Sequence, residues 1–182
     1  MGFWDWLMGT PSQTRELPAK QRRTKMPKKT SVLDLHVGDV VSYDEVDYVV
    51  KNKIVYSDEG FEWFDYMLHD AATDAVVWLS AEDDDGLQVG IYHEVDLDVT
   101  IPPVPRTITH EGRQYKQNEH SDAAVRVERE DATRSSQSRV EYWEYEAPGG
   151  HYLTVSRWGG DYEAAAGQAI KEYELKIFPA ME

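Results

Sequence analysis

The sequence predicts a mainly β protein, in which two similar antiparallel meanders form one barrel- or sandwich-like domain. Three observations predict it: apolar and polar residues alternate with a period of two after residue 30, turn residues interrupt the alternation at short intervals, and the order of strands in the first half recurs in the second. We expect one domain over residues 31–182, with halves at about 31–101 and 106–178.

In the first half we expect strands over residues 37–43, 48–51, 53–57, 62–70, 75–80, 87–92 and 95–101. Turn residues such as Asp44-Glu45 and Asp58-Glu59-Gly60 separate neighbouring strands. The half ends at the prolines of residues 102, 103 and 105, because proline cannot continue a paired strand.

In the second half we expect strands over residues 107–110, 113–117, 123–128, 142–147, 151–156 and 173–177. Tyr115 aligns with Tyr48 of the first half, residues 142–147 align with residues 62–67, and the closing strand 173–177 aligns with residues 97–101. A helix is expected at residues 162–166, where three alanines in a row depart from the strand pattern.

The charge is divided unevenly along the 182 residues. Residues 1–30 carry seven basic and two acidic side chains, whereas residues 31–182 carry 12 basic and 32 acidic ones. A body that acidic repels phosphate backbones, so we expect no nucleic-acid partner. The absence of cysteine excludes thiol chemistry and disulfides, and we expect no cofactor. Without a long apolar run or a signal peptide, we expect a cytoplasmic protein that can lie against the inner membrane.

The first 30 residues predict a short amphipathic helix, over residues 1–9, on a flexible basic tether. Two roles remain open. The segment could anchor the protein to an anionic membrane or to a partner, or its aromatic residues could pack on the body or on a second subunit. The anchor candidates are Phe3, Trp4, Trp6, Leu7 and Met8 on the helix, and Arg22, Arg23, Lys25, Lys28 and Lys29 on the tether.

Catalytic motifs are absent: the chain has no Gly-Lys-Ser/Thr loop, no nucleophile elbow and no His-Glu-x-x-His helix. The acidic run 82–86 is expected to be a solvated turn, because the first and twelfth positions of a calcium loop would be Ala81 and Tyr92. We therefore expect no metal. An enzyme remains an alternative if side chains converge between the two halves, the candidates being His69, Asp70, His93, Glu94 and His151.

Aromatic residues exceed what a core of this size requires, and several have acidic neighbours in sequence. An exposed aromatic surface with acidic residues at its edge would bind a polyamine, another cationic ligand or a basic partner protein. Aromatic ladders that only stabilise the sheet are the alternative. The candidate binding residues are Trp63, Asp65, Tyr66, Trp78, Trp143, Glu144 and Tyr145.

Three segments together resemble a bacterial family catalogued as domain of unknown function 4178. They are Leu35-x-Val37-Gly38-Asp39-Val40-Val41, Trp63-x-x-Tyr66-x-Leu68-x-Asp70 and Trp78-Leu79-Ser80-x-Glu82-Asp83. The resemblance covers about residues 31–178 and implies a compact, mainly β domain with no assigned catalytic residues. Asp65 stands where the family usually has glutamate, which keeps the charge.

Genes of this family often lie beside those of small membrane proteins, polyamine-synthesis-like enzymes and phage-shock-type membrane-stress proteins. The resemblance therefore implies an envelope-stress context. Our leading hypothesis is a non-enzymatic binding or adaptor domain with an unknown protein partner, and the alternatives are an enzyme with a His/carboxylate site or a structural subunit of a larger assembly.

Overall fold

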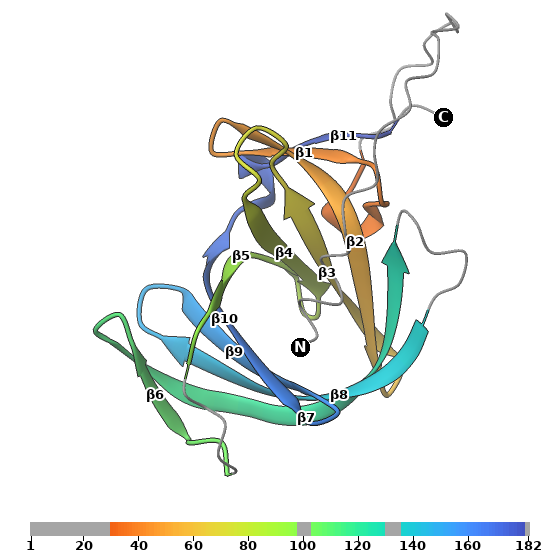
Figure 1. Cartoon of the computed structure of the whole chain (residues 1–182). Coiled ribbons are helices and arrows are strands. Elements are labelled where there is room, and N and C mark those ends of the chain that lie inside the picture. The colour runs from red at the N-terminus through yellow and green to blue at the C-terminus, as the bar shows by residue number, and fades with distance from the viewer. Residues whose placement is uncertain (1–29, 98–102, 130–135, 181–182) are drawn as a thin grey trace, which may run out of the picture.

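The computed structural model describes residues 30–97, 103–129 and 136–180 (Figure 1). The described residues form strands and two short 3-10 helices, η1 (Val32–Asp34) and η2 (Glu172–Glu174). Among these residues, no helix has the length and apolar character required to cross a membrane. The strands are β1 (Val40–Tyr43), β2 (Val46–Asp58), β3 (Phe61–His69), β4 (Val76–Asp83), β5 (Leu87–Val95), β6 (Thr107–His110), β7 (Arg113–Arg129), β8 (Ser136–Ala147), β9 (His151–Trp158), β10 (Asp161–Ile170) and β11 (Lys176–Phe178).

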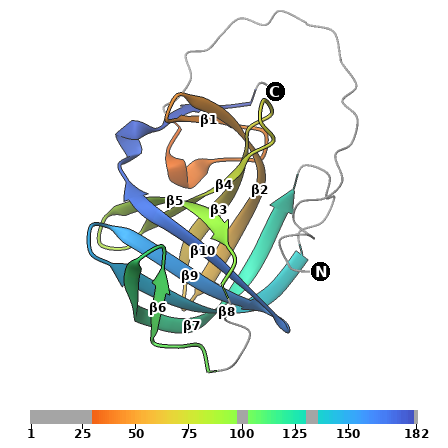
Figure 2. The same ribbon diagram turned by 60° about the vertical axis from the view of Figure 1, so that its left-hand side comes forward.

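Eight of these strands close into an antiparallel barrel. The hydrogen-bonded order is β2-β3-β4-β5-β10-β9-β8-β7, and β7 pairs in turn with β2, from Asn52 opposite Arg129 to Ser57 opposite Ala124. The other strands extend the sheet: β1 pairs with β2 and β11, and β6 pairs with β7. Figures 1 and 2 show β1 and β11 at one end of the molecule and β6 at the other. The prediction of a mainly β fold is confirmed, and of the two expected architectures, barrel and sandwich, the structure is the barrel.

The two halves of the chain use the same order of elements: a short strand, a long strand and three further strands. Tyr48 lies opposite Val41 in the first hairpin, and Tyr115 lies opposite Ile108 in the second. Each long strand then has a bulge soon after its tyrosine, between residues 50 and 52 in β2 and between residues 117 and 119 in β7. The hairpins therefore match as the sequence alignment predicted.

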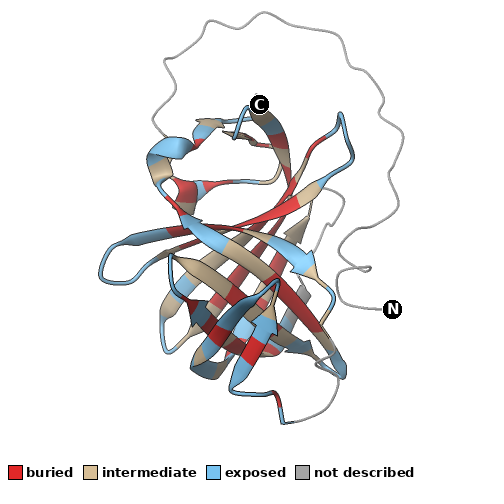
Figure 3. Cartoon of the chain, turned by 90° about the vertical axis from the view of Figure 1, so that its left-hand side faces the viewer, coloured by how far each residue is buried: buried red, intermediate tan, exposed pale blue. Residues whose placement is uncertain are grey.

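Figure 3 shows buried and exposed positions distributed along the same strands. Alternate residues on a strand point to opposite faces, and three apolar clusters result. The interior cluster joins both halves and consists of Ile54, Tyr56, Met67, Trp78, Ala123, Val125, Val127 and Val140. The first outer cluster packs η1 and Leu175 against β2–β5 through buried residues such as Leu35, Tyr66 and Leu79. The second outer cluster packs β6 and Val104 against β8–β10 through residues such as Trp143, Tyr145 and Val155.

Two fully buried tyrosines fasten the chain segments that cover these outer faces. The Tyr66 hydroxyl of β3 donates to the carbonyl of Leu33, at 3.1 Å, and the Tyr145 hydroxyl of β8 donates to the carbonyl of Pro105, at 2.7 Å. Both acceptors lie in the segment that precedes the hairpin of their own half. Each hydroxyl thus satisfies a carbonyl that packing removes from much of the solvent.

Replacing Tyr145 with phenylalanine is expected to lower the free energy of unfolding by about 1 kcal/mol, because the Pro105 carbonyl loses its donor while the ring still fills the cluster. Urea unfolding would measure the change. The matched control is Tyr173→Phe, since the Tyr173 side chain is 86% exposed and its loss of a hydroxyl should change stability by less than about 0.5 kcal/mol. Equal effects of the two substitutions would contradict the fastening role.

Several boundaries expected from the sequence are wrong. The strands expected at 48–51 and 53–57 are one strand, β2, and those expected at 113–117 and 123–128 are one strand, β7, since the chain passes through a bulge instead of a turn. The sequence predicts a separate strand at residues 95–101, but residue 95 is instead the last residue of β5. Residues 98–101 lie outside the described residues. Residues 173–177 are divided between η2 and β11.

The helix expected at residues 162–166 is also wrong. These residues belong to β10, which pairs with β9 on one side and β5 on the other. Small side chains suit this position: Ala164 packs in the second outer cluster while Ala165 faces the other way. Pairing on both edges outweighs the helix propensity of alanine. The expected N-terminal helix lies outside the described residues.

Candidate ligand site in the barrel interior

Acidic side chains from several strands, among them β3, β4, β7 and β8, point into the barrel. On β3, Trp63 and Met67 pack with the interior cluster, so Asp65 between them points to the same face. On β8, Tyr142 packs with that cluster, so Glu144, two residues later, also points inward. Their inward direction is supported by contacts between strands that are not neighbours. The Trp63 ring of β3 meets the Tyr142 ring of β8 edge-on, with 5.8 Å between centroids, although β2 and β7 lie between these strands in the sheet.

Asp65 is anchored by hydroxyl groups of the two adjacent strands. The side chains of Ser80 on β4 and Tyr56 on β2 both hydrogen-bond to its carboxylate. Burial raises the pKa of Asp65, and these two hydrogen bonds act in the opposite direction. Burial also raises the pKa of Tyr56 well above its usual value, and the charge of Asp65 and the hydrogen bond to Asp65 add to that effect.

Glu144 lies directly opposite Glu119 in the antiparallel pairing of β8 with β7. Like charges directly opposite one another destabilise a sheet, so this pair is costly when both carboxyl groups are ionised. Burial, followed by the charges of Glu119, Glu82 and Asp65, raises the pKa of Glu144 from 4.5 to about 7. Every charged group that acts on Glu144 in this way is another carboxylate.

Glu82 of β4 belongs to the same acidic group. Burial raises its pKa first, and the charges of Asp84, Glu119 and Asp65 raise it further. The Tyr142 hydroxyl donates to Glu119 Oε1 at 2.8 Å, which stabilises a negative charge on that oxygen. Asp65, Glu82, Glu119 and Glu144 are called the interior carboxylates below.

Aromatic rings form the wall beside the interior carboxylates. The Tyr56 and Trp63 rings stack with their centroids 5.2 Å apart and their planes 7° apart, and the Phe61 ring stacks with Trp63 at 5.9 Å between centroids. Tyr92 of β5 lies so close to Gly167 of β10 that a methyl group added there would be 2.6 Å from its ring. The interior is thus acidic on an aromatic background.

This combination suits an organic cation. Ammonium groups are attracted by carboxylates and by the faces of aromatic rings, most strongly where water is excluded. An eight-strand barrel is just wide enough to be filled by side chains or to hold one small ligand. The residues that could hold an ammonium group are therefore the interior carboxylates, with Trp63, Tyr56 and Tyr142 beside them.

The structure does not place the predicted binding residues on one exposed face. Trp63, Asp65 and Glu144 point into the barrel, and Trp78 is buried there with its Nε1 donating to Glu94 at 3.4 Å. The other three pack outside: Tyr66 in the first outer cluster, and Trp143 and Tyr145 in the second. The expected exposed aromatic surface is therefore wrong for these residues, because the closed sheet and its covering segments bury both of its faces.

Sequence reasoning missed Glu82, Glu119, Tyr56 and Tyr142 as part of the interior. Alternation could have found Glu82, which is separated by two and four positions from Ser80 and Trp78. Alternation also places Glu119 on the face of Ala123 and Val125, but the strand expected from the sequence begins at residue 123, four positions too late to include it. The alignment of Trp143 with Trp63 is wrong, because the two rings lie on opposite faces.

The histidine and carboxylate candidates for an enzyme do not converge. His69 Nε2 lies 2.7 Å from Asp74 in the turn after β3, and Asp70 accepts from the turn residues Ala72 and Thr73 instead. His93 is exposed on β5. Within residues 30–97, 103–129 and 136–180, no three His, Asp or Glu side chains are arranged to hold a metal ion.

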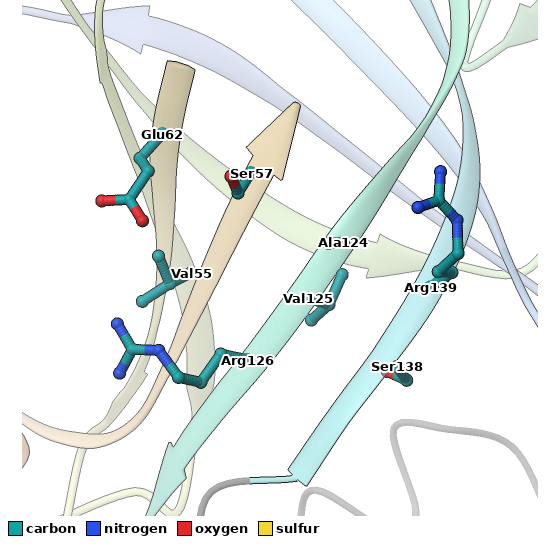
Figure 4. Close-up of a pocket in the computed structure, with 8 residues that line it drawn as sticks. All are labelled: Val55, Ser57, Glu62, Ala124, Val125, Arg126, Ser138 and Arg139. Atoms are coloured by element: carbon teal, nitrogen blue, oxygen red, sulfur yellow. The ribbon is translucent and has the colours of Figure 1, made fainter. Parts of the chain in front are cut away.

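Two grooves on the outer surface are less suited to a charged ligand. The larger, of about 530 Å³, crosses β3, β2, β7 and β8 and is lined by residues that include Val55, Glu62, Arg126 and Arg139 (Figure 4). Its two arginines are already paired with carboxylates, Arg126 with Glu128 and Arg139 with Asp122. The other groove, of about 480 Å³, is lined by His120, Ser121, Asp122, Glu141 and Arg157.

The second groove also consists of satisfied ion pairs. His120 Nε2 lies 2.9 Å from Glu141, and Arg157 pairs with the same carboxylate. Burial opposes ionisation of Glu141, but the hydrogen bonds and charges of these two partners prevail and lower its pKa. The anchor candidates of residues 1–29 lie outside the described residues, so membrane or partner anchoring stays a prediction.

Comparisons with known proteins agree with the resemblance. The chain is 24% identical, over 151 residues, to the uncharacterized proteins Rv2597 of Mycobacterium tuberculosis and Mb2628 of Mycobacterium bovis, which covers 79% of this chain and 71% of each relative. No solved structure matches the chain significantly. Residues 36–172, which include every interior carboxylate, match the family described as Domain of unknown function (DUF4178). The chain belongs to this family.

Proposed function

We propose that this domain is a binding protein that takes an organic cation, of the polyamine type, into its barrel. The observation that carries the proposal is the meeting of Asp65, Glu82, Glu119 and Glu144 beside an aromatic wall, where the charges acting on Glu144 are all negative. Bringing several like charges together is costly, most of all where some of them are partly buried, and a cation between them offsets that cost. Binding energy is thus expected to come from relieved repulsion as well as from new contacts.

A chain of spaced ammonium groups fits this interior better than a metal ion does. Metal binding requires three or more ligand atoms at one point, and the described residues provide no such group. The interior carboxylates instead come from four strands, β3, β4, β7 and β8, and are thus distributed around the wall. A flexible polyamine meets distributed carboxylates with successive ammonium groups.

Spermidine is expected to change the tryptophan fluorescence of the protein and to raise its melting temperature, because Trp63 lies beside the carboxylates and a ligand of the folded state stabilises it. Glu144→Gln or Asp65→Asn should weaken binding by about tenfold, the effect of one lost charge-assisted hydrogen bond of about 1.5 kcal/mol. Fluorescence titration at pH 8 measures the affinity of each protein for spermidine, and thermal unfolding with and without spermidine measures the change in melting temperature.

The control separates interior binding from general attraction to an acidic protein. Glu146→Gln removes the same charge from the same strand at an exposed position and should leave the affinity nearly unchanged. The proposal fails if spermidine leaves fluorescence and melting temperature unaltered. It also fails if Glu146→Gln weakens binding as much as Glu144→Gln, since that result indicates only nonspecific attraction.

A further inference from the structure

The pairing of β7 with β8 places two glutamates in direct opposition inside the barrel. We propose that this opposition makes Glu144 the proton acceptor of the pair, so that the barrel interior is a proton-sensitive device. The first support is the register: residues opposite one another in an antiparallel pair have Cβ atoms about 4.5–5.5 Å apart, within reach of each other's carboxyl groups.

The second support is the environment of Glu144. None of the charged groups that shift its pKa is positive. Carboxylates act on it from three other strands: Asp65 from β3, Glu82 from β4 and Glu119 from β7. Tyrosines face the same space from β2, β5 and β8. Those that respond to the Glu144 charge are Tyr56, Tyr92 and Tyr142. Glu163 of β10 acts on Tyr56, and Tyr152 of β9 acts on Tyr92.

The third support is an asymmetry within the pair. Glu119 is exposed and accepts a hydrogen bond from the Tyr142 hydroxyl at 2.8 Å. Glu144 is partly buried and lies farther from solvent, which favours the protonated form. The two carboxyl groups are therefore in different environments, and the one that takes up the proton is Glu144. The same logic separates acid from base wherever neighbouring carboxyl groups have unequal surroundings.

The device rests on the geometry of the barrel and not on a bound amine, so it stands if the proposed function fails. If the proposed function holds, the two are linked: an ammonium group that enters the interior displaces the proton of Glu144, and binding weakens as the pH falls. The proton would then regulate ligand binding at this site.

The test is a pH titration of the ligand-free, full-length protein with ¹³C-labelled glutamate, read from the side-chain carboxyl shifts. In the wild-type protein one glutamate is expected to titrate near pH 7, and its signal should be missing in Glu144→Gln. In Glu119→Gln the titration midpoint of Glu144 should fall but stay above 4.5, because burial, the largest cause of its raised pKa, remains.

One further variant makes the outcome decisive. Glu146→Gln, on the same strand but exposed, should leave the signal near pH 7 in place. A Glu144 midpoint near 4.5 in the wild-type protein would overturn the proposal, as would a midpoint that Glu119→Gln does not move. Backbone amide spectra establish that each variant is folded.

Discussion

Replacing Gly167 with alanine is expected to destabilise the protein by about 3 kcal/mol, the upper part of the range for overpacking a closed interior. A Cβ atom at this position would lie 2.2 Å from the Ile91 carbonyl oxygen and 2.6 Å from the Tyr92 ring. The ring could rotate, but the carbonyl belongs to the backbone of β5, to which β10 is paired. Relief therefore requires the two strands to separate.

Thermal unfolding checks this prediction. A loss of about 3 kcal/mol lowers the melting temperature by about 6–12 °C in a protein of this size. Gly160→Ala is the matched control, since an added Cβ there meets nothing within 4 Å and its stability should change by less than about 1 kcal/mol. The two substitutions differ in their surroundings and not in their chemistry.

The same experiment distinguishes the strand from the helix that the alanine run favours. In a helix that continued through residues 162–167, Gly167→Ala would stabilise the protein by up to about 1 kcal/mol, because alanine is the better helix former. A stabilising result would therefore contradict the position of β10 between β5 and β9. A loss of stability supports the strand, and a gain supports the helix.

Glu144→Gln is expected to stabilise the protein at pH 8 by about 2–3 kcal/mol while changing its stability little at pH 4.5. The pKa of Glu144 rises from 4.5 to about 7 on folding, so the folded state favours the protonated carboxyl group. The resulting stability is fully present below pH 4.5 and is lost as the pH rises through about 7. Glutamine cannot ionise and so avoids this loss.

Urea unfolding of both proteins at several values between pH 4.5 and 8.5 measures the effect. Asp70 and Glu141, whose pKa values are lowered in the folded state, lose stabilising interactions as the pH falls, and they do so in both proteins. The difference between the two unfolding curves therefore isolates Glu144. A difference that is the same at every pH would indicate a packing effect, and would contradict a costly negative charge on Glu144 among the interior carboxylates.

Much of the local structure follows from the order of residues. Turn residues and period-two alternation correctly predict the hairpin from Val40 to Val50, its counterpart with Tyr115, and the strands on either side of the turn at residues 70–75. These features depend on neighbours in sequence. The family assignment depends on the same segments, since their motifs lie on β1, β3 and β4 and in the turns beside them.

The candidate site is less predictable, because it depends on which face of each strand lies inside the barrel and not only on where the strands lie in the sequence. Alternation separates Trp63 and Asp65 from Phe64 and Tyr66, but it does not say which pair lies inside a closed sheet. The chemistry of Asp65 and Glu144 makes them binding candidates from the sequence, whereas their position inside the barrel depends on closure of the sheet. A one-residue error of register reverses every side chain, as the mistaken alignment of Trp143 with Trp63 illustrates.

The sequence by itself determined that this chain is an acidic, strand-rich protein with two similar halves, because composition, turns and alternation are local properties. Only the tertiary structure decided that β2 pairs with β7 and β5 with β10, and that the alanine run is a strand. These pairings join residues that are about seventy positions apart in sequence, and no local preference specifies them. Closure of the barrel is what brings the carboxylates of β3, β4, β7 and β8 together.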